Sequence, residues 1–255
     1  MDNSLRTQKL YVFEKHADMI TFFAGIWKGL ALKSMACRNR FVVALSGGST
    51  PVEFYQGIAL QTDLPWEKTH IFLVDERFLP SSHRDSNQNM IQKALVDNIL
   101  LPSENFHPIS PDLPSPLDSS LNYARHLKEF FELHEGSCPR FDLMVLGIGE
   151  DGHTASLFPE SNALNERNLL AAPVMLRDSR HDRITLTLPV INSAEMVFFL
   201  VTGENKAAVV KNVIKREEPL LPAAMVDPDN GMLIFLLDRE AATCLEEPAS
   251  APEAH

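Results

Sequence analysis

Short runs of consecutive apolar residues recur along the chain, each about as long as a buried β-strand. They lie at residues 11–13, 41–45, 71–74, 143–146, 196–201 and 232–237. Segments with the spacing of an amphipathic helix alternate with them, at 17–36, 87–99, 121–134 and 206–215. In the first of these the apolar face comprises Ile20, Phe23, Ala24, Trp27, Leu30 and Ala31. This alternation predicts an α/β fold, an open and mostly parallel sheet with helices on both faces.

The 255 residues show no internal repeat and no clear internal boundary, which favours a single domain. We expect this domain to span residues 1–245. Residues 246–255 are rich in Pro, Ala and Glu and predict a disordered C-terminal tail. Residues 101–117 carry five prolines and are expected to form a long surface connection.

Four of the predicted strands run directly into a segment dense in small or polar residues. These segments are SGGSTP at 46–51, DERFLP at 75–80, GIGEDGHT at 147–154 and TGENK at 202–206. In an open parallel sheet the loops that follow the strands share one edge, and ligands bind at that edge. We therefore expect these four segments, which are far apart in sequence, to meet at one pocket.

The first segment has the composition of a phosphate-binding loop. Gly47 and Gly48 let the backbone approach a ligand and direct N–H groups toward it, and Ser49 and Thr50 add hydroxyl donors. The helix expected to start at Pro51 would direct its N-terminus at an anion. A plain strand-to-helix turn explains the same residues, and the G-K-[ST] ending of a Walker loop is missing.

The third segment contains GIGEDG, which fits the dinucleotide-binding pattern G-x-G-x-x-G. Such a loop runs into a long helix, and an acidic residue follows about 20 residues later at the end of a second strand. Here Pro159 soon follows Gly152, and the sequence beyond it does not resemble a strand that ends in an acid. We expect instead that the glycines allow a sharp exit from the strand. This exit would place Asp151 and His153 at the sheet edge, where the histidine is either catalytic or structural.

Charged residues of the other segments are further candidates. Asp75 suits substrate hydroxyls or a proton, and the planar guanidinium of Arg77 suits an anion, although a solvated charged turn is the alternative. Lys206 opens a predicted helix, where a cation is unfavourable for the helix dipole, which indicates that it serves a ligand. Arg183 begins RITLTLP, whose alternating pattern is compatible with an edge strand.

Composition and charge narrow the classes of function. Hydrophobic residues make up 45% of the chain and charged residues 22%, as is usual for soluble globular proteins. The formal net charge of -11 argues against nucleic-acid binding but allows a small anionic ligand, because a few local cations outweigh the global field at short range. The cysteines form no C-x-x-C pair, which indicates a reducing compartment. Without a secretory signal or an uncharged run of about 18 residues, we expect a cytoplasmic protein that does not bind membranes.

Taken together, the motifs resemble those of the 6-phosphogluconolactonase family. The matching stretches are SGGSTP, VDERFLP with SSHRDSNQNM, LGIGEDGHTASLFP, RITLTLPVINSA, TGENKAAVV and PAAMVDPDNGMLIFLLDREAA, in the family's order and across residues 42–242. The resemblance implies a Rossmann-like α/β fold shared with glucosamine-6-phosphate deaminase, with no nucleotide bound. It also implies hydrolysis of 6-phospho-D-glucono-1,5-lactone in the oxidative pentose phosphate pathway.

The resemblance further implies a role for each candidate residue. His153 would be the general base that activates water, Arg77 would donate to the oxyanion, Asp151 would orient His153, and Asp75 would bind sugar hydroxyls. The 6-phosphate would be held by Arg183, Lys206 and the loop that comprises Ser46, Gly47, Gly48, Ser49 and Thr50. The expected partner is this small sugar phosphate, with no metal and no cofactor. The oligomeric state, monomer or dimer, stays open.

Two other functions compete with lactone hydrolysis. The deaminase loop resembles GxGxDGHxAFNEP, whose glutamate takes part in the acid–base chemistry of ring opening. Phe158 stands at that position when the two are aligned without gaps, and phenylalanine transfers no proton. The second alternative is a non-catalytic sugar-phosphate sensor, and the presence of His153 and Arg77 argues against it.

Overall fold

The computed structural model describes residues 7–176 and 181–245, and its centre is a seven-stranded parallel sheet. The strands lie in the order β1 (Thr7–Phe13), β10 (Met232–Asp238), β9 (Met196–Val201), β6 (Leu143–Leu146), β2 (Phe41–Leu45), β3 (Thr69–Leu73) and β5 (Phe106–His107). Five of the six predicted apolar runs fall within these strands and the sixth, 71–74, extends one residue beyond β3, while β2 and β6 are buried along their whole length. The predicted α/β class with a mostly parallel sheet is confirmed.

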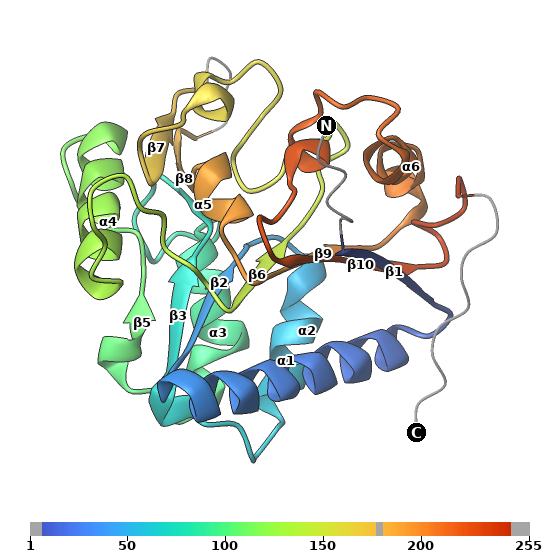
Figure 1. The fold of residues 1–255 in the computed structure, drawn as a ribbon, viewed down its shortest axis with the longest axis horizontal. Coiled ribbons are helices and arrows are strands. Elements are labelled where there is room, and N and C mark those ends of the chain that lie inside the picture. The colour runs from blue at the N-terminus through green and yellow to red at the C-terminus, as the bar shows by residue number, and fades with distance from the viewer. Residues whose placement is uncertain (1–6, 177–180, 246–255) are drawn as a thin grey trace.

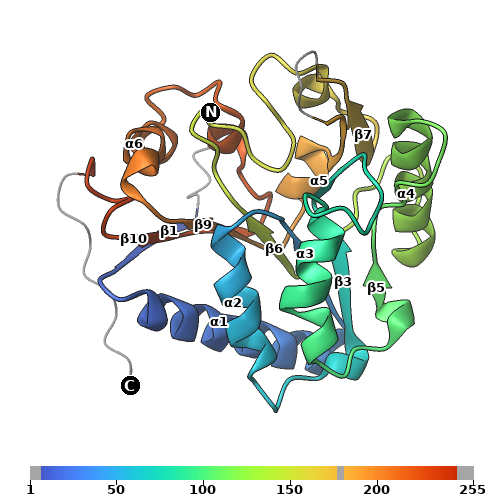
Figure 2. The same ribbon diagram turned by 180° about the vertical axis from the view of Figure 1, so that it is seen from behind.

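Helices cover both faces of this sheet (Figures 1 and 2). On one side lie α1 (His16–Arg38), α2 (Thr50–Ala59) and α3 (Asn87–Ala94), and on the other α5 (Leu188–Asn192) and α6 (Ala207–Lys215). At the edge near β5 lies α4 (Pro116–Phe130). Short 3-10 helices are η1 (Trp66–Lys68), η2 (Val96–Asn98), η3 (Ser103–Asn105), η4 (Asn162–Asn165), η5 (Glu204–Lys206) and η6 (Pro222–Met225). Five of the six residues predicted for the apolar face of α1 are buried, and Ile20 is partly buried.

A second sheet of three antiparallel strands, in the order β4 (Asp75–Arg77), β8 (Arg183–Leu186) and β7 (Ala171–Val174), corrects two expectations. The start of DERFLP is a strand rather than a loop, because it pairs with β8 immediately after leaving the main sheet. The strand that begins at Arg183 is central rather than an edge strand, since it pairs with β4 on one side and β7 on the other. The pairing of β4 with β8 joins segments about a hundred residues apart, which local alternation does not reveal.

The proline-rich segment 101–117 is more than a surface connection. It contains η3, it supplies β5, which pairs with β3 as the last strand of the main sheet, and it places Ile109 in the core. It ends where Ser115 caps α4 by accepting a hydrogen bond from the Asp118 backbone, so α4 starts five residues earlier than its apolar spacing predicts. The prolines stop longer strands from forming without preventing burial.

The strand order contains a topological switch point between β2 and β6. After β2 the chain continues to β3 on one side, and it later returns to place β6 on the other side of β2. Ligands of open α/β sheets bind beyond the carboxyl ends of the strands at such a point. Within the described residues no helix is long and apolar enough to cross a membrane. The predicted tail, 246–255, lies outside the described residues.

Candidate active site

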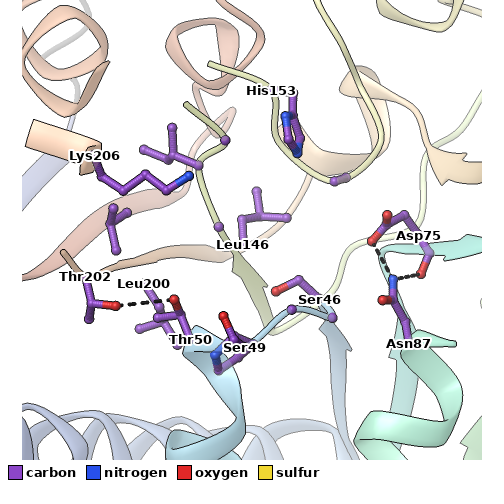
Figure 3. Close-up of a pocket in the computed structure, with 18 of the residues that line it drawn as sticks. Ser46, Ser49, Thr50, Asp75, Asn87, Leu146, His153, Leu200, Thr202 and Lys206 are labelled. Carbon is purple, nitrogen blue, oxygen red and sulfur yellow. Dashed lines mark hydrogen bonds between the residues drawn. The ribbon is translucent and has the colours of Figure 1, made fainter. Parts of the chain in front are cut away.

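A cavity of about 370 Å³ lies beyond the carboxyl ends of β2, β6 and β9. Ten of the eleven residues predicted for the site line it, and Asp151 is the exception. The ten are Ser46, Gly47, Gly48, Ser49, Thr50, Asp75, Arg77, His153, Arg183 and Lys206. Figure 3 shows how side chains from separate elements converge on this space. The expectation that the four polar segments meet at one pocket is therefore correct.

The SGGSTP segment wraps from β2 into the N-terminus of α2. Gly48 has a φ of +104°, a conformation that favours glycine, and Pro51 lies in the first turn of α2. Ser49 precedes the helix without a side-chain capping bond. Thr50 Oγ1 lies 3.3 Å from Thr202 Oγ1, which joins this loop to the one after β9. The hydroxyls and the first amides of α2 thus border the cavity, as an anion site requires.

The glycines after β6 form turns rather than a dinucleotide loop. Gly149 N donates to His153 O at 2.8 Å, Gly152 N donates to Gly149 O at 2.9 Å, and Gly152 has a φ of +78°. No long helix follows, and the next helical element in the described chain is the short η4. The expectation that the G-x-G-x-x-G match is fortuitous, and that the glycines present His153, agrees with this geometry.

The carboxylate of Asp151 contacts both the imidazole and the backbone of His153. Asp151 Oδ1 lies 2.5 Å from His153 Nδ1 and also accepts a hydrogen bond of 3.1 Å from the His153 backbone N–H. Partial burial raises the pKa of the Asp151 carboxyl, but the hydrogen bonds and the charge of His153 outweigh it and hold the pKa below its ordinary value. In the neutral imidazole, donation from Nδ1 to this carboxylate leaves the lone pair on Nε2. The ring of Phe158 lies 4.5 Å from the ring of His153, centroid to centroid.

Across the cavity, Asp75 and Arg77 belong to a buried network. Asp75 is 5% exposed and accepts hydrogen bonds from Ser156 Oγ at 2.6 Å and from Asn87 Nδ2 at 3.2 Å. Arg77 Nη1 donates to the Asp85 carbonyl at 2.6 Å and to Asn87 Oδ1 at 2.8 Å. Arg77 Nε is buried and has no hydrogen-bond partner in the part of the chain that the structure describes. The guanidinium is therefore anchored through Nη1 while the side chain lines the cavity.

Lys206 and Arg183 complete a cationic lining. Lys206 is the last residue of η5 and directly precedes α6, and Figure 3 shows its side chain reaching into the space below His153. Arg183 begins β8, and its Nε donates to the His181 carbonyl at 3.0 Å. Among the described residues, three cationic side chains and one carboxylate thus line the cavity, although the whole chain carries a net charge of -11. The local field favours a small anion.

A family model named glucosamine-6-phosphate isomerases/6-phosphogluconolactonase matches residues 14–235, which is most of the chain. The chain belongs to this family. The resemblance expected from the sequence motifs is confirmed, and the matched region includes every residue of the cavity lining.

Individual members of the family are similar over most of their length. A 6-phosphogluconolactonase from Synechocystis sp. is 41% identical over 211 residues, which covers 82% of this chain and 86% of the relative. A 6-phosphogluconolactonase from Homo sapiens is 38% identical and covers 83% of both chains. Among solved structures, a 6-phosphogluconolactonase from Trypanosoma brucei aligns with a TM-score of 0.84 at 26% identity, over 94% of this chain and 100% of that one.

Two further polar residues that line the cavity, Asn87 and Thr202, were not predicted from the sequence. Asn87 lies in SSHRDSNQNM, where Ser86 signals the start of a helix, but nothing local shows that its side chain turns back to Asp75 and Arg77. Thr202 is the first residue of TGENK, and an uncharged hydroxyl in a polar segment gives no specific signal beside the cation Lys206. Among the described residues no group of three His, Cys, Asp or Glu side chains is arranged to hold a metal ion.

Proposed function

We propose that this chain hydrolyses 6-phospho-D-glucono-1,5-lactone to 6-phospho-D-gluconate in the oxidative pentose phosphate pathway, with His153 as the general base. The prediction of an enzyme of this class, a lactone hydrolase, is confirmed by the curated relatives that carry that name. The observation that carries the mechanism is the pair formed by His153 and Asp151, which leaves Nε2 available beside a cationic cavity.

In the proposed reaction, Nε2 of His153 accepts a proton from water while the water oxygen attacks C1 of the lactone. A neutral imidazole suits this step near neutral pH, and Asp151 stabilises the imidazolium that forms. The tetrahedral intermediate carries a negative oxygen, for which the guanidinium of Arg77, which lines the cavity, is the donor. The bond between C1 and the ring oxygen then breaks, and the imidazolium returns its proton to that oxygen.

The other end of the substrate carries the phosphate, and the cations and oriented donors of the cavity suit it. Lys206 and Arg183 supply charge, and the N-terminus of α2 with Ser49 and Thr50 supplies oriented donors. Asp75 is placed to accept from sugar hydroxyls with the lone pairs that Ser156 and Asn87 leave unused. The lactone would thus be held at both ends, with C1 toward His153.

Phe158 argues against the deaminase activity that also occurs in the family. It is 8% exposed, packs on the His153 ring and has no group that transfers a proton. A ring-opening deamination that depends on a glutamate at this position would lack its acid–base group.

One assay distinguishes these functions. The lactone is generated in situ from glucose 6-phosphate by a dehydrogenase, and its loss is followed at mildly acidic pH, where spontaneous opening is slower. We expect the chain to accelerate this loss far above the blank without releasing ammonia from glucosamine 6-phosphate. A rate equal to the blank would refute the proposal, and tight binding of 6-phosphogluconate without turnover would then point to a sensor.

A further inference from the structure

Asn87 joins two side chains of the site that have opposite electrostatic character. It is the first residue of α3, it lines the cavity, and it is 2% exposed. Its Nδ2 donates to the backbone carbonyl of Asp75 at 2.9 Å and to Asp75 Oδ1 at 3.2 Å, as Figure 3 shows. Its Oδ1 accepts from Arg77 Nη1 at 2.8 Å. One amide therefore connects a carboxylate to a guanidinium.

The chemistry of this position requires both a donor and an acceptor in one planar group. An ionised carboxylate would accept from Arg77 but would have no proton to give to Asp75, and it would repel that carboxylate at about 3 Å. An aliphatic side chain would leave the buried polar atoms of Asp75 and Arg77 without these partners, which is costly in a buried site. An amide satisfies both neighbours at once.

The backbone of Asn87 is fixed by a buried carboxylate that stands outside the reaction. Glu76, 1% exposed, accepts from the backbone N–H groups of Asn87, Gln88 and Arg77, each at 2.7 Å, and from Ser86 Oγ at 3.0 Å. Burial raises the pKa of the Glu76 carboxyl, and these four hydrogen bonds oppose that increase. Glu76 thus connects the N-terminus of α3 to β4, and this connection fixes the position of the Asn87 backbone from which the side chain extends.

The phosphate-binding loop packs directly against the same amide. A Cβ atom at Gly47 would overlap Asn87 Oδ1 and Cγ and would lie 2.9 Å from Asn87 Nδ2. Glycine at position 47 therefore makes room for this amide. The loop after β2, the strand β4 and the helix α3 all meet at Asn87.

We propose that Asn87 is a positioning residue for the reaction, which sets the direction of the Arg77 guanidinium and of the Asp75 carboxylate relative to the bound lactone. The inference rests on the proposed function, because it concerns the reacting end of that substrate. With Nη1 of Arg77 held by Asn87 and by the Asp85 carbonyl, the guanidinium that lines the cavity is held in one orientation.

The test compares Asn87→Ala and Asn87→Asp with wild type in the lactone assay. For Asn87→Ala we expect kcat to fall by about 100-fold, the cost typical of a misplacement of about 1 Å, with KM changed much less because Lys206 and Arg183 still hold the phosphate. Asn89→Ala is the matched control on the same helix. Asn89 Nδ2 donates to the His83 carbonyl at 3.1 Å, away from Asp75 and Arg77, so kcat should stay near the wild-type value.

The pH dependence of kcat in the Asn87→Asp variant distinguishes a positioning role from a purely structural one. When its new carboxyl is protonated, it is an isostere of the amide, with one donor for Asp75 and one acceptor for Arg77. When it is ionised, only acceptors remain, and it repels Asp75. The ratio of kcat for this variant to kcat for wild type should therefore fall as pH rises from about 5 to about 8.

The outcomes separate the two claims. Wild-type turnover no faster than the blank would overturn the proposed function, and the role of Asn87 would fall with it. Wild-type turnover together with Asn87 variants that keep wild-type kcat at every pH would overturn the positioning role alone. Thermal unfolding of each variant at each pH shows whether a loss of kcat reflects a loss of folded protein, and the pH-dependent ratio for Asn87→Asp is compared only at pH values where the variant is fully folded.

Discussion

Substitution of Gly149 by alanine should displace the candidate general base, His153, while leaving its side chain chemically unchanged. Gly149 lies in the turn that carries Asp151 and His153, and its φ is not in the left-handed region, so alanine is compatible with its backbone. A Cβ atom at this position would overlap His153 Nδ1 and Cε1 and would lie 2.6 Å from Asp151 Oδ1. The imidazole and the carboxylate must both move to accommodate one methyl group.

The size of the effect follows from these contacts. An ordinary van der Waals contact begins at about 3.4 Å, so Asp151 must shift by at least about 0.8 Å, and His153 by more. A misplacement of about 1 Å at a catalytic group typically costs about 100-fold in rate. We therefore expect kcat for the phosphorylated lactone to fall by about two orders of magnitude in Gly149→Ala, while KM stays within a few fold because the phosphate-binding residues are unchanged.

Gly147→Ala is the matched control in the same loop. A Cβ atom at Gly147 would meet no atom within 4 Å, so this substitution tests whether the loop tolerates a methyl group as such. Its kcat should remain within a few fold of wild type. If Gly149→Ala is folded and retains full kcat, the pair formed by His153 and Asp151 does not perform the chemistry in the arrangement described here.

Three further results are expected. Asp151→Asn should lower kcat by roughly 10- to 100-fold with little change in KM, because the amide no longer fixes the tautomer of the imidazole; equal kcat for variant and wild type would contradict the orienting role. Lys206→Ala should raise KM for the phosphorylated lactone by about 10-fold or more and weaken the preference over unphosphorylated gluconolactone, and an unchanged KM with an unchanged preference would place the phosphate elsewhere. Burial, followed by the neighbouring His126 and His70, lowers the pKa of His107 from 6.5 to about 3, so the folded state resists a proton that the unfolded chain accepts. The stability that His107 contributes is complete above pH 6.5 and is lost as pH falls toward 3, by up to about 1.4 kcal/mol per pH unit. Urea unfolding of wild type and His107→Gln should therefore show a steeper decline toward low pH in wild type, and parallel declines would refute this assignment.

The main sheet was predictable because its central strands are short and buried on both faces. Such strands appear in sequence as uninterrupted apolar runs, and the run from Phe41 to Leu45 is followed at once by the glycines that leave the sheet. Because parallel strands end at a common edge, the polar segments after β2, β6 and β9 also predicted one pocket, and the structure places them there.

The smaller sheet and the role of Asn87 were not predictable in the same way. Asp75 begins a strand only because Thr185 lies opposite it, and no local pattern encodes a partner more than a hundred residues away. The two residues of β5 are too few for any periodicity. In the sequence, Asn87 is an ordinary polar residue in the first turn of a helix. Only the structure shows how closely its side chain is enclosed, because a Cβ atom at Gly47 would overlap it.

The central claim is that His153, oriented by Asp151, takes the proton from the attacking water. The most direct test is kcat of His153→Ala beside wild type, measured with lactone generated in situ and corrected for spontaneous opening. General-base catalysis contributes about 100- to 10,000-fold, so kcat should fall by that factor while KM, which reflects Lys206 and Arg183, changes little. Full kcat in a folded His153→Ala protein would contradict the account and would transfer the base to another group of the cavity.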